Sequence, residues 1–328
     1  MALKDTEYAF ASAKIRAKEG QATSSEKAMA YLDCKSISAL YDLVLSGVTL
    51  TDLTQKEAIE SQLDKRIQDA FDLVKENVPE PKYFDFLLYE YDCCNIKTLI
   101  KCMIRGISAE GMLYSYSTAD VEELKSGLEK RNLEGILPTN MASAALEAIE
   151  MYNKTQDPKK IDFILDKACF ADMTENSALC GCKLARELVR HRIDAINIIT
   201  LQRILKSDIA DKKSIFEQAF IENGLLSLKE LLSAYDSEPT SLSELLRGTP
   251  YSLVIGKIGA EPTLAQLEKA FDEAYLALAR EQRYVPFGAE VVCSYLVNTL
   301  FDVKNARVVL AGLAAGLPNE KIRERVRF

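Results

Sequence analysis

Carboxylate and amide side chains recur three residues apart at three places in the sequence, in the pattern apolar-Asp-x-x-Asn. The pairs are Asp92 with Asn95, Asp194 with Asn197, and Asp302 with Asn305. Asp and Asn are poor residues for a helix interior, and a spacing of three places both side chains on one face of a helix. Such a pair has the groups for acid–base chemistry, or for holding nearby backbone by hydrogen bonds.

The repetition of the pair argues against catalysis. A catalytic pair of groups needs two environments that push the two pKa values apart, whereas this pair recurs with aspartates 102 and 108 residues apart. A buried Asn can donate and accept hydrogen bonds at once, which fixes the register of packed helices. We therefore favour a structural role for the six residues, and the alternative is a polar lining shared by three related domains.

Other candidates for chemistry are weak. The single histidine, His191, stands between Arg190 and Arg192, and no further metal ligands lie near it in the sequence. The phosphate-binding loop, the dinucleotide-binding turn and the nucleophile elbow are all missing. The eight cysteines form no Cys-x-x-Cys pair, and we expect buried, reduced thiols in a cytosolic protein. We expect no catalytic residue, no cofactor and no metal site.

The composition predicts a large helical protein. The 328 residues are 48% hydrophobic, and glycine (14) and proline (9) are sparse, which favours long uninterrupted helices. The net charge of −8 argues against nucleic acid and against binding to anionic lipid by charge alone. The apolar stretch 308–317 is shorter than the roughly 20 residues that span a membrane. We expect no direct membrane span, so that any membrane location depends on another protein.

Apolar residues at three- and four-residue steps predict helices throughout the chain. The expected helices are 54–76, 84–106, 120–131, 140–152, one opening at 157–158, 178–206, 214–220, 226–235, a short one at 241–247, 263–282, 290–311 and 319–328. Gly106 is expected to stop the second of them. The apolar stretch 252–258 could be extended. The basic run at the end, from Lys321 to Arg327, is expected to be a solvated, frayed end. The alternatives are docking on acidic partner loops and a position near lipid headgroups.

Apolar positions travel with the repeated motif. Five residues before each aspartate stand Leu87, Val189 and Val297, and seven residues after it stand Leu99, Leu201 and Val309. These positions are consistent with one core-facing stripe on each helix. Self-similarity of this length is typical of repeated structural units. We predict helical repeats at 1–120, which includes the N-terminal segment and part of the closing repeat, at 121–225 and at 226–328.

Several segments together resemble a known family. They are the opening 8–18, the motif helix 91–101, the core of the Asp194 copy, the turn 220–225, and the ending 302–307 followed by Gly312 and 316–318. The sequence resembles the C subunits of the V-type/A-type ATPases (ATP synthases), which are equivalent to the d subunits of eukaryotic vacuolar enzymes. It departs from the family's pattern at Ile199, where a lysine is expected, and at Asn223, where a glycine is expected. The resemblance spans about residues 8 to 326.

The resemblance implies an all-α fold of three similar helical domains around a pseudo-threefold axis, shaped as a funnel. It implies a non-catalytic central-stalk adaptor that links the stalk shaft to the membrane rotor ring and transmits torque for ATP-coupled proton or sodium transport. It also implies one copy per complex, a cytoplasmic position peripheral to the cell membrane through the ATPase, and six motif residues that are structural or line the funnel.

Two other interpretations stay open. The first is a helical-repeat scaffold that binds proteins in another assembly, which an open superhelix would favour. The second is an all-helical enzyme, which would need clustered carboxylates for metal or acid–base work. A deep pocket that joins two copies of the motif around a bound Mg²⁺ would favour the enzyme.

Overall fold

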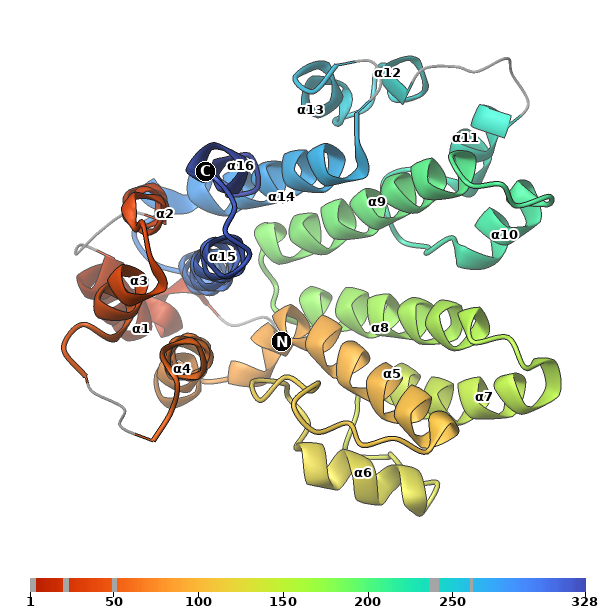
Figure 1. Cartoon of the computed structure of the whole chain (residues 1–328), viewed down its shortest axis with the longest axis horizontal. Coiled ribbons are helices and arrows are strands. Elements are labelled where there is room, and N and C mark those ends of the chain that lie inside the picture. Colours follow the sequence, from red (N-terminus) through yellow and green to blue (C-terminus); the bar gives the residue numbers. More distant parts are fainter. Residues whose placement is uncertain (1–3, 20–23, 49–51, 236–241, 260–261) are drawn as a thin grey trace. The chain divides into compact units, whose positions relative to one another are not determined.

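The computed structural model describes residues 4–19, 24–48, 52–235, 242–259 and 262–328, and these residues form helices and no strands (Figure 1). The all-α fold class is thereby confirmed. The chain divides into two compact units, one of residues 1–82 with 265–328 and the other of residues 83–264. The division into three repeats stays a prediction.

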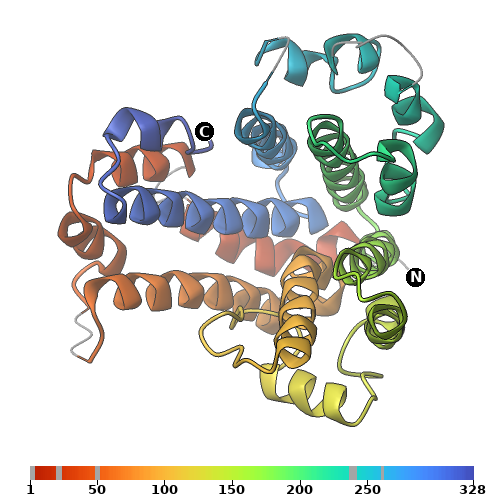
Figure 2. The same ribbon diagram turned by 45° about the vertical axis from the view of Figure 1, so that its right-hand side comes forward.

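The first unit is organised around one long helix, α15 (Ala289–Ala314), most of whose residues are buried. It packs against α1, α2, α3, α4 and α16. Figure 2 shows α15 (blue) running alongside α4 (orange). The other elements are η1 (Asp5–Tyr8), α1 (Ala9–Glu19), α2 (Ser24–Asp33), α3 (Ile37–Leu45), α4 (Gln55–Asn77), η2 (Pro81–Leu87, which runs into the second unit), α14 (Leu264–Arg280), η4 (Glu281–Tyr284) and α16 (Asn319–Arg323).

The second unit is organised around α8 (Lys159–Leu179), which packs against α5, α7 and α9 (Figure 1). Its other elements are α5 (Tyr89–Arg105), α6 (Val121–Glu129), α7 (Thr139–Thr155), α9 (Lys183–Leu205), α10 (Lys212–Ala219), α11 (Leu228–Leu232), η3 (Ser233–Tyr235), α12 (Leu242–Leu245) and α13 (Ser252–Gly256). Gly106 ends α5 in a left-handed conformation, as predicted. Asp120 caps α6 and Ser227 caps α11 through their side chains.

Three regions differ from the sequence prediction. The expected helix 178–206 is the end of α8 and the start of α9, separated at Gly181, whose φ of 75° interrupts helical geometry. Cys182 then caps α9, because its Sγ accepts from the backbone N–H of Ala185. The stretch 252–258 is not extended, since Ser252–Gly256 forms the helical turn α13. Helices α1, α2 and α3 lie where the periodicity had assigned none.

The basic end of the chain is not frayed. The side chain of Arg327 is 11% exposed, and its Nε lies 2.9 Å from Oδ2 of Asp272 on α14. This carboxylate oxygen also lies 2.7 Å from Nζ of Lys304 on α15. The expectation of a solvated end was therefore wrong for Arg327, because a buried carboxylate on a neighbouring helix holds its guanidinium.

Six of the eight cysteines are buried, Cys34 is half-buried and Cys94 is exposed, and all are free thiols. None of the helices that the described residues form is long and apolar enough to cross a membrane.

Candidate functional site

The asparagine of every motif holds one backbone residue downstream. Its Nδ2 donates to that residue's carbonyl oxygen, and its Oδ1 accepts from the same residue's N–H, at distances of 2.8 to 3.0 Å. The pairs are Asn95 with Tyr114, Asn197 with Ile221, and Asn305 with Arg327. All three asparagines are fully buried. The amide therefore performs the same task in each copy: it ties the motif helix to the chain that follows it.

The aspartates of the first two copies also bind backbone downstream. Oδ1 of Asp92 accepts from the N–H of Ala119 at 3.0 Å, and its Oδ2 accepts from the hydroxyl of Thr118 at 2.5 Å. Asp194 accepts from two successive N–H groups, those of Leu225 at 2.9 Å and Leu226 at 3.1 Å. Ala119 and Leu226 each stand directly before the capping residue of the next helix. We call these two copies the closed motifs.

Tyr251 completes the Asp194 site. Its hydroxyl donates to Oδ2 of Asp194 at 2.7 Å, and its ring centroid lies 5.5 Å from that of His191. His191 is itself buried, on the same helix as Asp194. Burial raises the pKa of Asp194, and the hydrogen bonds from Tyr251, Leu225 and Leu226 oppose this shift. The histidine thus lies against the tyrosine that supports the carboxylate.

Asp92 shows most clearly what burial does to these carboxylates. It is fully buried, and burial raises its pKa to about 6 although Thr118 and Ala119 donate hydrogen bonds to the charged form. The hydrogen bonds that lower its pKa come from neutral donors. Asp92 therefore titrates nearer to neutral pH than an ordinary aspartate.

The third copy differs at its aspartate, and we call it the open motif. Oδ2 of Asp302 accepts from the hydroxyl of Tyr31 at 3.3 Å and lies 3.6 Å from Nζ of Lys27. Oδ1 is buried, and it has no hydrogen-bond partner among the residues that the structure describes. Burial raises the pKa of Asp302, while Lys27 and Arg66 lower it. The backbone donors that the closed motifs hold are replaced here by a hydroxyl and a cation.

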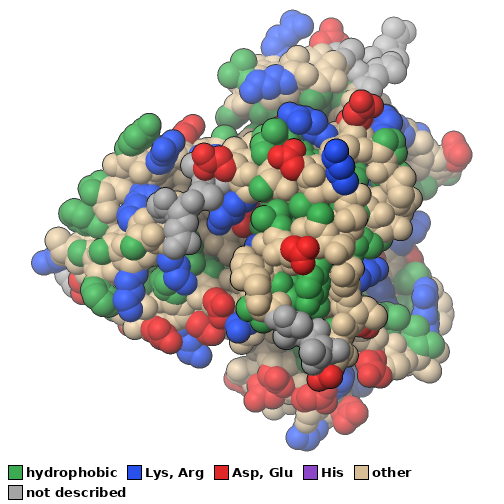
Figure 3. Space-filling view, turned by 60° about the vertical axis from the view of Figure 1, so that its left-hand side comes forward, with side chains coloured by type: hydrophobic (Ala, Val, Ile, Leu, Met, Phe, Trp, Pro, Cys, Tyr) green, Lys and Arg blue, Asp and Glu red, His purple; other side chains and the backbone are tan. Residues whose placement is uncertain are grey.

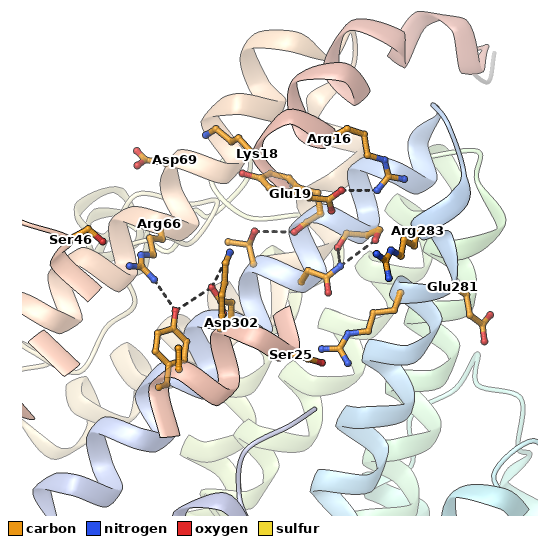
Figure 4. A pocket seen from close by; sticks show the side chains of 18 of the residues that line it. Arg16, Lys18, Glu19, Ser25, Ser46, Arg66, Asp69, Glu281, Arg283 and Asp302 are labelled. Carbon is orange, nitrogen blue, oxygen red and sulfur yellow. Dashed lines mark hydrogen bonds and ion pairs between the residues drawn. The ribbon is translucent and has the colours of Figure 1, made fainter. Parts of the chain in front are cut away.

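Asp302 lines a cavity of about 1180 Å³ within the first unit. Side chains from α1, α2, α3, α4, α14, η4 and α15 surround it. Arg66 donates to the Tyr31 hydroxyl, which in turn donates to Asp302. Figure 4 shows Arg66, Asp302, Lys18 and Arg283 among the side chains of this cavity. The charged lining residues are six basic and four acidic: Arg16, Lys18, Lys27, Arg66, Arg280, Arg283, Glu19, Asp69, Glu281 and Asp302. The charged side chains of the lining carry an excess of positive charge around one buried carboxylate.

Sequence reasoning missed the residues that surround Asp302. Lys27 and Tyr31 come from α2 and Arg66 from α4, more than 200 residues before the motif. Tyr251 likewise lies far from its motif in the sequence, 57 residues after Asp194. A repeat search finds what the copies share, and these residues belong to single copies. Their only sequence signal is a tyrosine or a cation within an amphipathic helix, which is too common to be informative.

On the face drawn in Figure 3, basic and acidic side chains are interspersed with apolar side chains, and several acidic side chains gather along the lower edge of the view. Of the six residues predicted as structural or funnel-lining, all are buried. Asp92, Asn95, Asp194 and Asn197 lie in the second unit, and Asp302 and Asn305 lie in the first. Their role as a funnel lining stays a prediction.

Comparisons with known proteins point to one family. The model of the ATP synthase (C/AC39) subunit family matches residues 11–325. The C subunit of the A-type ATP synthase of Methanocaldococcus jannaschii is 25% identical, over 96% of this chain and 85% of that protein. The C subunit of the V-type sodium ATPase of Enterococcus hirae is 23% identical, over 98% of each chain. The C subunit of the A-type ATP synthase of Pyrococcus abyssi is 24% identical, over 98% of this chain and 91% of that protein.

Proposed function

The chain belongs to the ATP synthase (C/AC39) subunit family, and from this premise we propose that it is the non-catalytic central-stalk adaptor of a rotary V-type/A-type ATPase. In this role it links the stalk shaft to the membrane rotor ring and transmits torque for ATP-coupled transport of protons or sodium ions. The observation that carries the proposal is the family match along almost the whole chain, together with relatives that are named as C subunits of such enzymes.

The physical character of the chain supports this role. A torque adaptor must resist deformation, and close-packed helices have low compressibility and transmit strain. In the first unit, α15 is buried among five other helices, so a force on one of them reaches the rest. An adaptor also needs broad interfaces with two partners rather than one reactive pocket.

The proposal includes a place and an arrangement. The partners are the central stalk subunits and the membrane rotor ring, with one copy of the chain per complex. The chain lies on the cytoplasmic side, peripheral to the membrane, and is held there by the ATPase. The repeats at 1–120, 121–225 and 226–328 surround a pseudo-threefold axis, and the six motif residues stabilise the repeats or line the funnel between them.

Removal of the chain from its ATPase tests the role. We expect the catalytic head to keep hydrolysing ATP while ATP-driven ion pumping into vesicles is lost, because the link is mechanical and neither chemistry resides in this chain. Addition of the purified chain to the depleted complex restores pumping. Normal pumping by the depleted complex would refute the proposal, and so would co-purification of the tagged chain with a different assembly alone.

A further inference from the structure

We infer that Cys180 and Cys182 form a peroxide-reactive pair of thiols, in which Cys182 reduces a small hydroperoxide and Cys180 then closes a disulfide bond with it. The pair lies in the second unit, where α8 ends and α9 begins. The inference goes beyond the proposed function and does not depend on it, because it concerns a reaction of this chain alone.

The two sulfur atoms are already in contact. Sγ of Cys180 lies 3.7 Å from Sγ of Cys182, and a disulfide bond brings two sulfur atoms to about 2.05 Å. The chain turns at Gly181, whose φ is 75°, so the two cysteines lie in a turn and not in a continuous helix. Rotation of the two side chains is therefore enough to close the bond, and neither helix needs to unwind.

The position of Cys182 makes it the thiol that reacts first. It precedes the first turn of α9, and its Sγ accepts from the backbone N–H of Ala185 at 3.4 Å. A backbone donor and the positive end of a helix dipole both stabilise a thiolate, which is the nucleophilic form of cysteine. Cys180 stands at the other end of a helix, because it caps the C-terminus of α8. There the dipole disfavours negative charge, so Cys180 takes the second step.

The reaction balances with a hydroperoxide as the oxidant. The thiolate of Cys182 attacks one oxygen of the peroxide and the O–O bond breaks, which leaves a sulfenic acid on Cys182. The other oxygen departs with the proton that the thiol lost, as water or an alcohol. Sγ of Cys180 then attacks Sγ of Cys182, the S–O bond breaks, and the leaving hydroxide takes the proton of the Cys180 thiol as water. The two sulfur atoms together lose two electrons, and the peroxide gains them.

The surroundings of the turn favour a small oxidant. Leu179, Gly181 and Lys183 are exposed, whereas Cys180 and Cys182 between them are 4% and 5% exposed. The thiols are thus close to the surface but largely covered. A hydroperoxide of the size of hydrogen peroxide needs only a slight opening of the turn, whereas a bulky disulfide or alkylating reagent needs the turn to open locally.

Other cysteines of the chain serve as internal comparisons. Cys93 and Cys94 are adjacent in the sequence, but they lie within α5, one buried and one exposed. Successive side chains of a helix point about 100° apart, so a disulfide between these two would require α5 to unwind. Cys34 is half-buried, and burial together with the carboxylate of Asp33 raises the pKa of its thiol. Its thiolate fraction is therefore small.

The test treats the purified, reduced full-length chain with hydrogen peroxide in the presence of a metal chelator. The remaining thiols are then alkylated, and the products are mapped by mass spectrometry. We expect the peptide that contains both cysteines to lose two hydrogen atoms, through a bond that fragmentation places between Cys180 and Cys182. Dithiothreitol should reverse the change. We expect Cys182 to be oxidised roughly 10-fold faster than Cys34, because a larger fraction of its thiol is ionised.

Three variants separate the roles of the two thiols. In Cys180→Ser the reaction should stop at the sulfenic acid of Cys182, which dimedone labels. Cys182→Ser should form neither the sulfenic acid nor the disulfide. Serine is a good residue for the N-cap of a helix, so this variant should keep the start of α9 and the melting temperature of the wild type. Cys94→Ser is the matched control: it removes an exposed thiol outside the pair and should form the disulfide at the wild-type rate.

Several results would overturn the inference. They are oxidation of Cys34 or Cys94 while Cys180 and Cys182 stay reduced, a sulfenic acid on Cys182 of the wild type that Cys180 never resolves, and labelling of Cys180 by dimedone in Cys182→Ser. The adaptor role stands whichever result is found, because none of these measurements involves the ATPase.

Discussion

The surroundings of Asp194 and Asp302 differ although both aspartates occupy the same position in the repeated motif. Asp194 accepts from two backbone N–H groups and a tyrosine hydroxyl, all from its own unit. Asp302 accepts from one tyrosine hydroxyl and faces a cation, and its second oxygen is unpartnered among the described residues. The asparagines show no such difference. The amide of the motif therefore has the same structural role in all three copies, whereas the hydrogen-bond partners of the carboxylate differ between the copies.

The largest effect on stability is expected when the asparagine, which has the same role in all three copies, is replaced. We expect Asn197→Ala and Asn305→Ala each to lower the free energy of unfolding by about 4 kcal/mol, because each removes the amide that binds one backbone N–H and one carbonyl. Asn95→Ala should cost less, because the carbonyl of Tyr114 also accepts from the Ser117 hydroxyl. Denaturant unfolding of the isolated chain measures this. A clearly smaller loss for Asn305 than for Asn197 would show that the third copy differs at its amide as well.

The next largest effect is expected when the aspartate, whose partners differ between the copies, is replaced. Asp194→Ala should cost about 3 kcal/mol, because three donors lose their acceptor. Asp302→Ala should cost clearly less, because it removes one hydroxyl hydrogen bond and one half-exposed ion pair together with a buried oxygen that has no described partner. The two variants are matched in residue type and motif position. Equal destabilisation by both would contradict the distinction between closed and open motifs.

The third prediction concerns pH at the other closed motif. Burial raises the pKa of Asp92 to about 6 in the folded chain, above the ordinary value of about 3.9. Because the pKa of Asp92 is higher in the folded chain than in the unfolded chain, protonation of Asp92 stabilises the fold. This stabilisation is fully present at a pH below the unfolded pKa and is lost as the pH rises through about 6.

We therefore expect the stability of the wild type, relative to Asp92→Asn, to fall by about 3 kcal/mol between pH 3.5 and 7.5. Unfolding of both proteins across this range measures the difference, in which the other titrating groups cancel. A difference that is constant with pH would show that the hydrogen bonds from Thr118 and Ala119 balance burial, and one that grows as the pH rises would show that they outweigh it.

The repeated motif locates these sites in the sequence but not their surroundings, for a physical reason. Helical periodicity and the Gly106 stop follow from local preferences, and the spacing of Asp and Asn predicts one buried face. The partners are distant: Tyr251 follows Asp194 by 57 residues, and Tyr31 precedes Asp302 by 271. Distant contacts depend on the tertiary packing of the helices, which no local pattern encodes. The break at Gly181 was missed because the residues on both sides continue the helical pattern.

The smallest effect is expected from a variant that tests how closely the residues around Asp194 are packed. Gly224 lies directly before Leu225, and a Cβ at this position would stand 2.1 Å from Oδ1 of Asp194. The side chain of Asp194 is held by three donors, so it cannot withdraw without losing hydrogen bonds, and the added Cβ would also stand 3.1 Å from Cγ2 of Ile193. We expect Gly224→Ala to cost about 2 kcal/mol, the usual range for overpacking.

A matched control supports the interpretation of that variant. Gly256, in the same unit, would meet nothing within 4 Å on gaining a Cβ, so Gly256→Ala should leave the stability unchanged or slightly higher, because alanine restricts the unfolded chain. If the two variants melt alike, the Asp194 site is loose enough to admit a methyl group. The Asp194 carboxylate would then be able to shift its position. In that case the two sites would differ in the number of hydrogen-bond donors and not in how rigidly they hold the carboxylate.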